Sequence, residues 1–254
     1  MDIPSAPAQS ICQQCPEQVD LDFDFTMAFQ PIIDCRNRTL FGYEALVRGL
    51  NNESAHSVIA RVNDSNRYRF DQLCRIKAIA LAARLGMKGM LSINFLPNAV
   101  YRPERCIRTT LQAAREHHFP IEQIMFELTE VEQVQDSQHI RGIVDHYQAL
   151  GFKTAIDDFG AGYSGLNLLA DFHPNIVKLD MHLLRGIDHD PTRQAIVRHS
   201  LALFVELQIT PLAEGIETRE EMICLREMGI SLMQGYLFAR PGFENLPEVD
   251  FASL

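Results

Sequence analysis

The 254-residue chain lacks tryptophan and has fewer basic than acidic residues, 23 lysines and arginines against 33 aspartates and glutamates. No apolar run approaches the roughly 20 residues of a membrane-spanning helix, so we expect no membrane span. The formal net charge of -10 also argues against the basic surface that nonspecific binding to DNA or anionic membranes requires. The composition therefore predicts a soluble protein that does not bind DNA, and an anionic ligand would need a local reversal of charge.

Several common motifs are also missing. The chain has no Gly-x-Gly-x-x-Gly after the first predicted strand and no Gly-x-x-x-x-Gly-Lys-Ser/Thr, so dinucleotide-binding and P-loop folds lose their main support. The N-terminus has no basic segment followed by an apolar one, which argues against a secretory signal. Six cysteines in a chain of this size do not make a disulfide scaffold. We therefore predict a cytoplasmic protein.

Residues 1–22 are rich in Gln, Pro, Ser and Asp, and we interpret them as a flexible or partner-docking leader before a domain at 23–254. Cys12 and Cys15 form an isolated C-x-x-C in this leader. The pattern occurs in redox pairs and as half of a zinc site, although incidental tail cysteines remain the simpler interpretation. The other four cysteines lie among apolar neighbours and are predicted core residues: Cys35, Cys74, Cys106 and Cys224.

Beyond the leader, apolar runs of strand length alternate with segments of helical periodicity. Strands are predicted at 25–33, 39–48, 90–95, 123–128, 154–158, 175–179, 210–213 and 231–238, and helices at 70–83, 106–117, 137–150, 165–172, 192–207 and 219–228. The short turn at 34–38 predicts that the first two strands are antiparallel. About eight strands separated mostly by helices predict an α/β fold, a modified TIM (β/α)8 barrel with an irregular antiparallel first strand.

Polar side chains mark the ends of the predicted strands. In a strand-helix barrel the C-terminal strand ends share one face, which carries the active site. The residues there are oxygen donors with a single lysine: Glu44, Asn94, Glu127 with Glu130, Asp157 with Asp158, Lys178 with Asp180, Glu214 with Glu217, and Gln234. One acid at a strand end is usually a solvated rim residue. Seven strand ends in succession predict a site.

The donor types indicate the chemistry of this site. Oxygen donors without His or Cys suit Mg²⁺ or Mn²⁺ better than Zn²⁺. The adjacent Asp157 and Asp158 would repel each other in a cleft unless a cation offset their charge, and so many acids suggest two ions. Two ions about 3.5–4 Å apart activate water for attack at phosphorus, so we predict phosphodiester hydrolysis. Lys178 would orient the water or balance phosphoryl charge, or alternatively pair with Asp180 or another acid.

With these residues in view, the chain resembles the EAL-domain cyclic di-GMP phosphodiesterases over nearly everything after the leader. Six motifs carry the resemblance in order: Gly42-Tyr43-Glu44-Ala45-Leu46-Val47-Arg48, Ser92-Ile93-Asn94-Phe95, Phe126-Glu127-Leu128-Thr129-Glu130, Asp157-Asp158-Phe159-Gly160, Val177-Lys178-Leu179-Asp180 and Ala213-Glu214-Gly215-Ile216-Glu217-Thr218. The resemblance implies hydrolysis of cyclic di-GMP to linear pGpG with Mg²⁺ or Mn²⁺, in bacterial second-messenger signalling.

The resemblance also implies individual roles. Those similar to metal ligands are Glu44, Asn94, Glu127, Asp157 and Asp158, with Asp157 bridging two ions. Those similar to catalytic residues are Lys178, Glu214, Gln234 and Glu130, the last of which steadies the loop after Asp158. Those similar to substrate contacts are Gln30, Leu46, Arg48 and Glu217, and the guanidinium of Arg48 suits a phosphate.

The loop at 159–165 carries regulation and dimer contact in that family, so a homodimer is expected. Ala161 and Gly165 stand where the family usually has Thr and Ser, so this loop has lost one hydroxyl and some rigidity. The alternative to an enzyme is a catalytically idle cyclic di-GMP receptor that acts through a protein partner. A third interpretation is a protein-interaction module in which the nucleotide is incidental.

Overall fold

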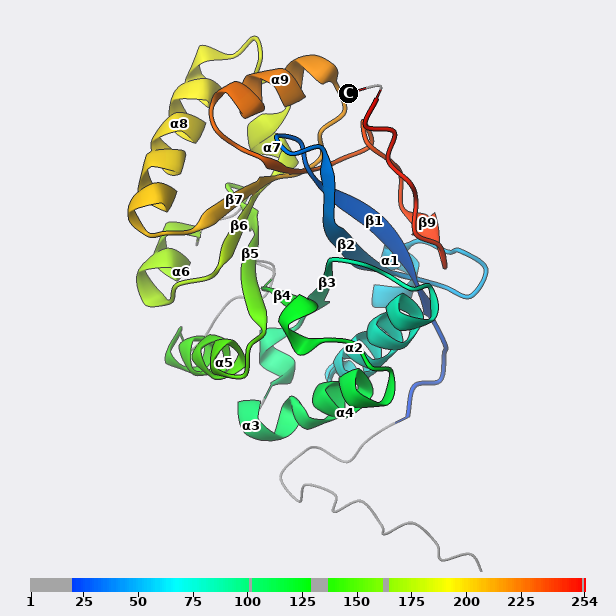
Figure 1. Cartoon of the computed structure of the whole chain (residues 1–254). Coiled ribbons are helices and arrows are strands. Elements are labelled where there is room, and N and C mark those ends of the chain that lie inside the picture. Colours follow the sequence, from blue (N-terminus) through cyan, green and yellow to red (C-terminus); the bar gives the residue numbers. More distant parts are fainter. Residues whose placement is uncertain (1–19, 101, 129–136, 162–164, 253) are drawn as a thin grey trace, which may run out of the picture.

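A barrel of eight strands with helices around it forms the body of the protein (Figure 1). The computed structural model describes residues 20–100, 102–128, 137–161, 165–252 and 254. The sheet closes because β1 (Thr26–Asp34) pairs with both β2 (Thr39–Arg48) and β8 (Leu232–Gln234). This confirms the predicted modified TIM barrel. Most of the predicted leader, with Cys12 and Cys15, lies outside the described residues.

The strands from β2 to β8 are parallel, and β1 runs antiparallel to both β2 and β8. The antiparallel pairing of β1 with β2 is the one that the short turn predicted. That turn is held by Asp34, whose Oδ1 accepts from the backbone N–H of Arg36 and of Asn37 at 3.0 Å. The remaining strands are β3 (Met90–Phe95), β4 (Ile124–Leu128), β5 (Lys153–Phe159), β6 (Ile176–Leu179), β7 (Thr210–Ala213) and β9 (Gly242–Phe243), which pairs with β1 outside the barrel closure.

Helices cover the outside of the barrel (Figure 1). They are α1 (Ala55–Ile59), α2 (Arg67–Arg84), α3 (Pro103–Cys106), α4 (Arg108–Glu116), α5 (Ser137–Ala149), α6 (Gly165–Asp171), α7 (Met181–Leu184), α8 (Pro191–Glu206) and α9 (Arg219–Glu227), with 3₁₀ turns at Pro97–Ala99 and Ile121–Gln123. The main core lies between the sheet and these helices. Among the described helices, none has the length and apolar character to cross a bilayer.

The predicted elements differ from the structure in three places. The segment 106–117, predicted as one helix, forms α3 and α4, which meet at Ile107; Pro103, a residue favoured in a first helical turn, starts α3 early. The predicted strand 231–238 was too long. Its chain leaves the sheet at Gly235, which lies so close to Ile216 that a Cβ would meet the Ile216 backbone at 2.1 Å. The short α1, α7 and β9 were not predicted.

Candidate active site

The inside of the barrel changes from apolar to polar along the strands. An apolar floor consists of Ile32, Met125, Ala155, Ile176, Leu212 and Leu232. Two residues further along their strands stand Glu127, Asp157, Lys178 and Gln234, on the same face because side chains alternate with period two. The apolar floor therefore closes the barrel below a layer of buried polar groups.

Lys178 lies at the centre of this polar layer, with its side chain 1% exposed. Its Nζ lies 2.7 Å from Glu214 Oε1, 2.8 Å from Glu127 Oε2, 3.0 Å from Asp157 Oδ1 and 3.8 Å from Glu44 Oε2. One cation thus faces four carboxylates, and the site keeps an excess of negative charge. The prediction that the strand-end acids and the lysine converge agrees with this arrangement.

Amide side chains hold Glu44 from both sides. Asn94 Nδ2 donates to Glu44 Oε1 at 2.9 Å, and Gln234 Nε2 donates to Glu44 Oε2 at 2.7 Å and to Gln30 Oε1 at 3.1 Å. In the described part of the chain, the buried Gln234 Oε1 has no hydrogen-bond partner. The Glu44 carboxylate is thereby fixed, and an acceptor is left over at the site.

Asp157 and Asp158 both belong to the site because β5 is irregular there. The register with β6 shifts between Ile156 and Phe159, and Asp158 has a φ of +55°. Neighbouring residues in a regular strand point to opposite faces, and a bulge can re-aim one of them. The bend in β5 is stabilised by the backbone N–H of Asp158, which donates to Asp157 Oδ1 at 3.0 Å.

The carboxylates form two groups that share Asp157. Glu44, Glu127 and Asp157 form the first, called the Glu44 group here, and Asp157, Asp158 and Glu214 form the second, the Glu214 group. Within each group one ligand atom per residue lies within 4.8 Å of the others. Both groups offer only carboxylate oxygens, which suit hard divalent cations. The donor set and the excess of negative charge fit the metal ions expected from the sequence.

Burial strongly shifts the titration of these groups. Burial raises the pKa of Glu127 to about 8, a shift that Lys178 opposes and the charge of Glu44 increases. Burial and the neighbouring Asp157 raise the pKa of Asp158 to about 6, and burial also raises the pKa of Glu214. Burial alone would lower the pKa of Lys178, but the surrounding carboxylates raise it well above its usual value. A cation binds the deprotonated form of these groups, so its binding would release protons.

A pocket of about 260 Å³, called the mouth here, opens beside the polar layer. It is lined by Gln30, Glu44, Asp158, Asp180, Met181, Glu214, Gly215, Glu217, Gln234, Gly235 and Tyr236. Of the predicted substrate contacts, Gln30 and Glu217 reach this lining, and Glu217 accepts a hydrogen bond from Arg185 Nη2 at 2.8 Å. Tyr236 is 50% exposed and carries the guanidinium of Arg240 over its ring.

The other predicted substrate contacts lie apart from this mouth. Arg48 Nη1 donates to the carbonyl of Val47 at 2.7 Å, and Leu46 lines a separate apolar cavity of about 370 Å³ beside α1. Asp180 lines the mouth, but its Oδ1 accepts from the N–H of His182 and so caps α7. Glu130 lies outside the described residues.

Glu44 was predicted at a strand end but stands in the middle of β2, so this detail was wrong. β2 pairs with β3 only from Gly42 to Ala45 and continues along the antiparallel β1 as far as Arg48. Glu44 therefore lies where the parallel pairing ends, at the level of the other acids. Sequence reasoning also missed Ser92, whose hydroxyl donates to Glu127 Oε1. The signal was its position two residues before Asn94 on the same strand.

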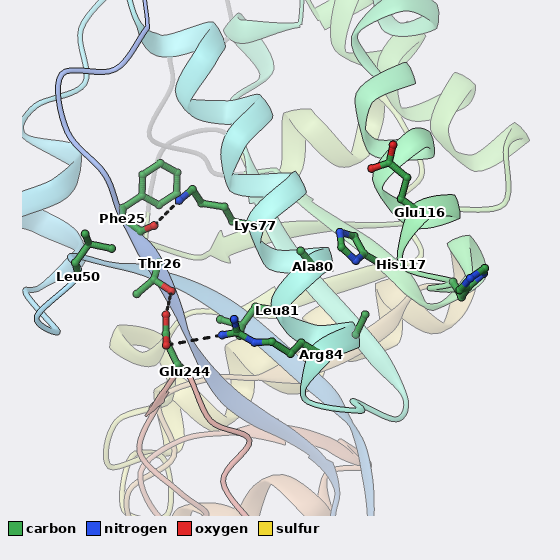
Figure 2. A pocket seen from close by; sticks show the side chains of 12 residues that line it. Phe25, Thr26, Leu50, Lys77, Ala80, Leu81, Arg84, Glu116, His117 and Glu244 are labelled. Carbon is green, nitrogen blue, oxygen red and sulfur yellow. Dashed lines mark hydrogen bonds and ion pairs between the residues drawn. The ribbon is translucent and has the colours of Figure 1, made fainter. Parts of the chain in front are cut away.

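A larger cleft, of about 730 Å³, lies against α2 and contains none of these acids. Figure 2 shows Glu244 facing both Thr26 and Arg84, and the Lys77 side chain reaching the carbonyl of Phe25. Lys77 Nζ lies 2.6 Å from Asp24 Oδ1 and 2.8 Å from the carbonyl of Phe25. Glu244, Arg84 and Lys77 are thus engaged by other groups of the protein, and we place the candidate site in the barrel, where the acids converge.

Comparisons with known proteins agree with this geometry. The blue light- and temperature-regulated antirepressor BluF of Escherichia coli (strain K12) is 32% identical over 226 residues, which are 87% of this chain and 55% of BluF. The cyclic di-GMP phosphodiesterase RocR of Pseudomonas aeruginosa is 34% identical over 170 residues, 66% of this chain and 42% of RocR. The chain thus spans about half the length of these curated relatives.

Solved structures match as well. A standalone versatile EAL protein from Vibrio cholerae O395, in its c-di-GMP bound form, gives a TM-score of 0.90 at 66% identity over 92% of this chain and 99% of that one. Klebsiella pneumoniae BlrP1 in a manganese/cy-diGMP complex at pH 9.0 gives 0.84 at 35% identity over 92% of this chain and 60% of that one. A family model described as EAL domain matches residues 14–241. The chain therefore belongs to the EAL domain family.

Proposed function

We propose that this protein is a phosphodiesterase that hydrolyses cyclic di-GMP to linear pGpG with the help of divalent metal ions. The observation that carries the proposal is the pair of carboxylate groups sharing Asp157 around the buried Lys178. The name of RocR and the nucleotide bound in the Vibrio structure support cyclic di-GMP as the substrate.

Two ions, Mg²⁺ or Mn²⁺, would be held by the residues of the Glu44 group with Asn94 and by Asp157 with Asp158, and Glu214 is left for proton transfer. The manganese in the BlrP1 complex supports this choice of metal. When bound, such a pair activates a water molecule and stabilises the attacking and departing oxygens at phosphorus. The ions also supply the local positive charge that an anionic nucleotide needs in this acidic cleft.

The residues around the metals orient the reactants. Lys178 is a fixed donor among the acids, and it steers the attacking water or a phosphoryl oxygen. Glu214, whose pKa burial raises, is placed to take up the proton of that water. Oxygen from water bonds to phosphorus, the P–O3′ bond breaks, and the proton passes to the departing 3′ oxygen. The product is the linear pGpG.

Substrate contacts are proposed at the mouth. Gln30 and Glu217 line it and would face the nucleotide, and the exposed ring of Tyr236 offers a stacking surface. Leu46 and Arg48 remain proposed contacts. Arg48 would exchange the Val47 carbonyl for a phosphate, which is the better partner for a guanidinium.

The test is to incubate the purified protein with cyclic di-GMP and Mg²⁺ or Mn²⁺, and to separate the products by chromatography. We expect pGpG only with metal present, none with EDTA, and none from Glu44→Ala, which removes a member of the Glu44 group. Intact cyclic di-GMP in every sample would refute the stand-alone enzyme.

The second candidate function is a receptor that binds cyclic di-GMP without cleaving it and signals through a protein partner. The name of the relative BluF, an antirepressor, favours action through a partner. A receptor would bind the nucleotide and return it unchanged after prolonged incubation with metal. We also propose a homodimer, which light scattering tests, and a regulatory partner, which pull-downs with and without residues 1–22 test.

A further inference from the structure

A buried ion pair lies in α2, behind the strands that carry two of the proposed metal ligands. Asp71 Oδ2 and Arg75 Nη2 are 2.7 Å apart, one turn from each other, and their side chains are 1% and 0% exposed. Removing two charges from water is costly, and an apolar pair of similar size is often as stable. Stability alone therefore does not explain this pair, and its contacts indicate another role.

The second oxygen of Asp71 holds the end of β3. Asp71 Oδ1 accepts from the backbone N–H of Leu96 at 3.0 Å, just past the last residue of the strand. Leu96 follows Asn94 by two residues, and Asn94 donates to Glu44 Oε1. The backbone that carries Asn94 is thus tied to a helix outside the barrel at the point where strand pairing ends.

Arg75 extends the same support to β4. Its guanidinium lies over the rings of Phe95 and Phe126, 5.4 Å and 5.0 Å from their centroids, and its Nη1 donates to the hydroxyl of Tyr147 in α5 at 3.0 Å. Because side chains alternate along a strand, Phe95 faces outward where its neighbour Asn94 faces inward. Phe126 and Glu127 are related in the same way.

Asn94 and Glu127 are also register partners in the neighbouring strands β3 and β4. A cation held between the outward rings of the two strands fixes one strand relative to the other, and α2 lies directly against β3 (Figure 1). The pair therefore acts on the spacing of two side chains at a single site, the Glu44 group with Asn94. It makes no contact of this kind with Asp158 or Glu214.

We propose that Asp71 and Arg75 are positioning residues for one of the two proposed metal sites. They set the separation of Asn94 and Glu127 through the Leu96 N–H and the rings of Phe95 and Phe126. The proposal rests on the proposed metal site, and it assigns the pair to the Glu44 group rather than to the Glu214 group. Supporting residues of this kind change metal affinity by about 10- to 100-fold.

The experiment titrates the full-length, metal-free protein with Mn²⁺ by calorimetry and by electron paramagnetic resonance. Asp71→Leu/Arg75→Met removes both charges together, so no buried charge is left unpaired. Asp71→Asn/Arg75→Met also removes both charges but keeps an oxygen that can accept from Leu96. Val197→Ala, a buried position in α8, is the control for general destabilisation. Circular dichroism and urea unfolding monitor the fold of each variant.

We expect wild type to bind two Mn²⁺ ions. In Asp71→Leu/Arg75→Met, one of the two sites should weaken by about 10- to 100-fold while the other keeps its wild-type affinity. Asp71→Asn/Arg75→Met should recover only the part of the lost affinity that depends on the Leu96 N–H and should stay weaker than wild type, because Arg75 is absent. Val197→Ala should bind as wild type does. A merely structural role would predict equal losses in the two double variants and in the control.

Unchanged Mn²⁺ affinity in Asp71→Leu/Arg75→Met would overturn the positioning role and leave the metal site standing. Absence of Mn²⁺ binding by wild type would overturn the metal-dependent function itself. Should the apolar double variant fail to fold, Tyr147→Phe removes only the hydroxyl that accepts from Arg75. It should weaken one Mn²⁺ site by about threefold, the scale of one hydrogen bond, and no change would count against the proposal.

Discussion

At the scale of single residues, Lys178 offsets part of the negative charge of the metal-free site. It is the cation nearest to four carboxylates, and its side chain is buried. Removing one partner of a buried ion pair leaves uncompensated charge, whereas surface pairs contribute little. The residue thus has two separable effects, one on the stability of the metal-free protein and one on the proposed hydrolysis.

We predict that Lys178→Met destabilises the EDTA-treated protein by about 3–5 kcal/mol at pH 8. The loss should shrink toward pH 6, because without the cation the carboxylates hold protons more firmly in the folded state than in the unfolded state. Urea unfolding measures both values. Lys77→Met is the matched control, since Lys77 pairs with Asp24 at a partly exposed position. An equal effect of the two substitutions would contradict the prediction.

The chemical types of the side chains at the site could be predicted from the sequence, whereas the direction and partners of individual side chains could not. Acidic and amide side chains at strand ends indicated oxygen ligands for metal, and these residues converge. The sequence could not predict where the Arg48 side chain points, because its guanidinium can donate to the nearby Val47 carbonyl as well as to a phosphate. The role of Ser92 was missed because its position two residues before Asn94 places it on the same face of the strand but does not reveal its partner Glu127.

At the scale of elements, the loop after β7 depends on a close approach to α7. Gly215 has a φ of +64°, and a Cβ there would lie 2.4 Å from Met181 Cβ. Gly186 has a similar φ of +67°, but a Cβ there would have no other atom within 4 Å. Both glycines therefore have a left-handed backbone conformation, but only Gly215 is crowded by a neighbouring side chain.

We predict that Gly186→Ala costs about 1–2 kcal/mol through its left-handed backbone alone. Gly215→Ala should cost more and should also lower pGpG formation, because the displaced loop carries Glu214. Urea unfolding gives the stabilities, and product chromatography gives the activities. Equal stability losses with full activity in both variants would show that the contact with Met181 is unimportant.

The ends and irregularities of strands depend on tertiary contacts, which the hydrophobic periodicity of the sequence does not reveal. The segment 231–238 continues to look like a strand beyond Gln234, but Ile216 takes over the hydrogen bonds there: Ile216 N–H donates to Gln234 O and Leu237 N–H donates to Ile216 O, both at 3.0 Å. The bulge that brings Asp157 and Asp158 together was likewise absent from the predicted strand. Both features arise from pairing with a neighbouring strand or loop.

At the scale of the whole molecule, pH and metal ions act together on stability. Burial raises the pKa of Glu127 to about 8 and that of Asp158 to about 6, above the values of unfolded carboxylates. These two groups therefore bind more protons in the metal-free folded state than in the unfolded state between about pH 5 and pH 8, and their contribution to stability falls as pH rises through that range. Metal ions reverse the trend because they bind the deprotonated groups.

We predict that the melting temperature of the EDTA-treated protein, as far as this site governs it, falls between about pH 6 and pH 8. The increase caused by saturating Mn²⁺ should grow over the same range, and Mn²⁺ binding should release protons. Thermal unfolding at each pH, with calorimetry in buffers of different ionisation enthalpy, measures these effects. The variant Glu127→Gln, which cannot titrate, should lose much of the pH dependence. A constant Mn²⁺ effect from pH 6 to pH 8 would contradict the assignment.

Residue order alone was sufficient to predict the alternation of strands and helices, the antiparallel first strand, the closed barrel and the oxygen-rich side chains that converge inside it. These features follow from local periodicity, turn residues and side-chain chemistry. Only the folded chain shows Lys178 against Glu127, 51 residues apart in sequence, and Asp71 against the end of β3. Such contacts depend on how separate elements pack and on the distances that result, and no short stretch of sequence encodes them.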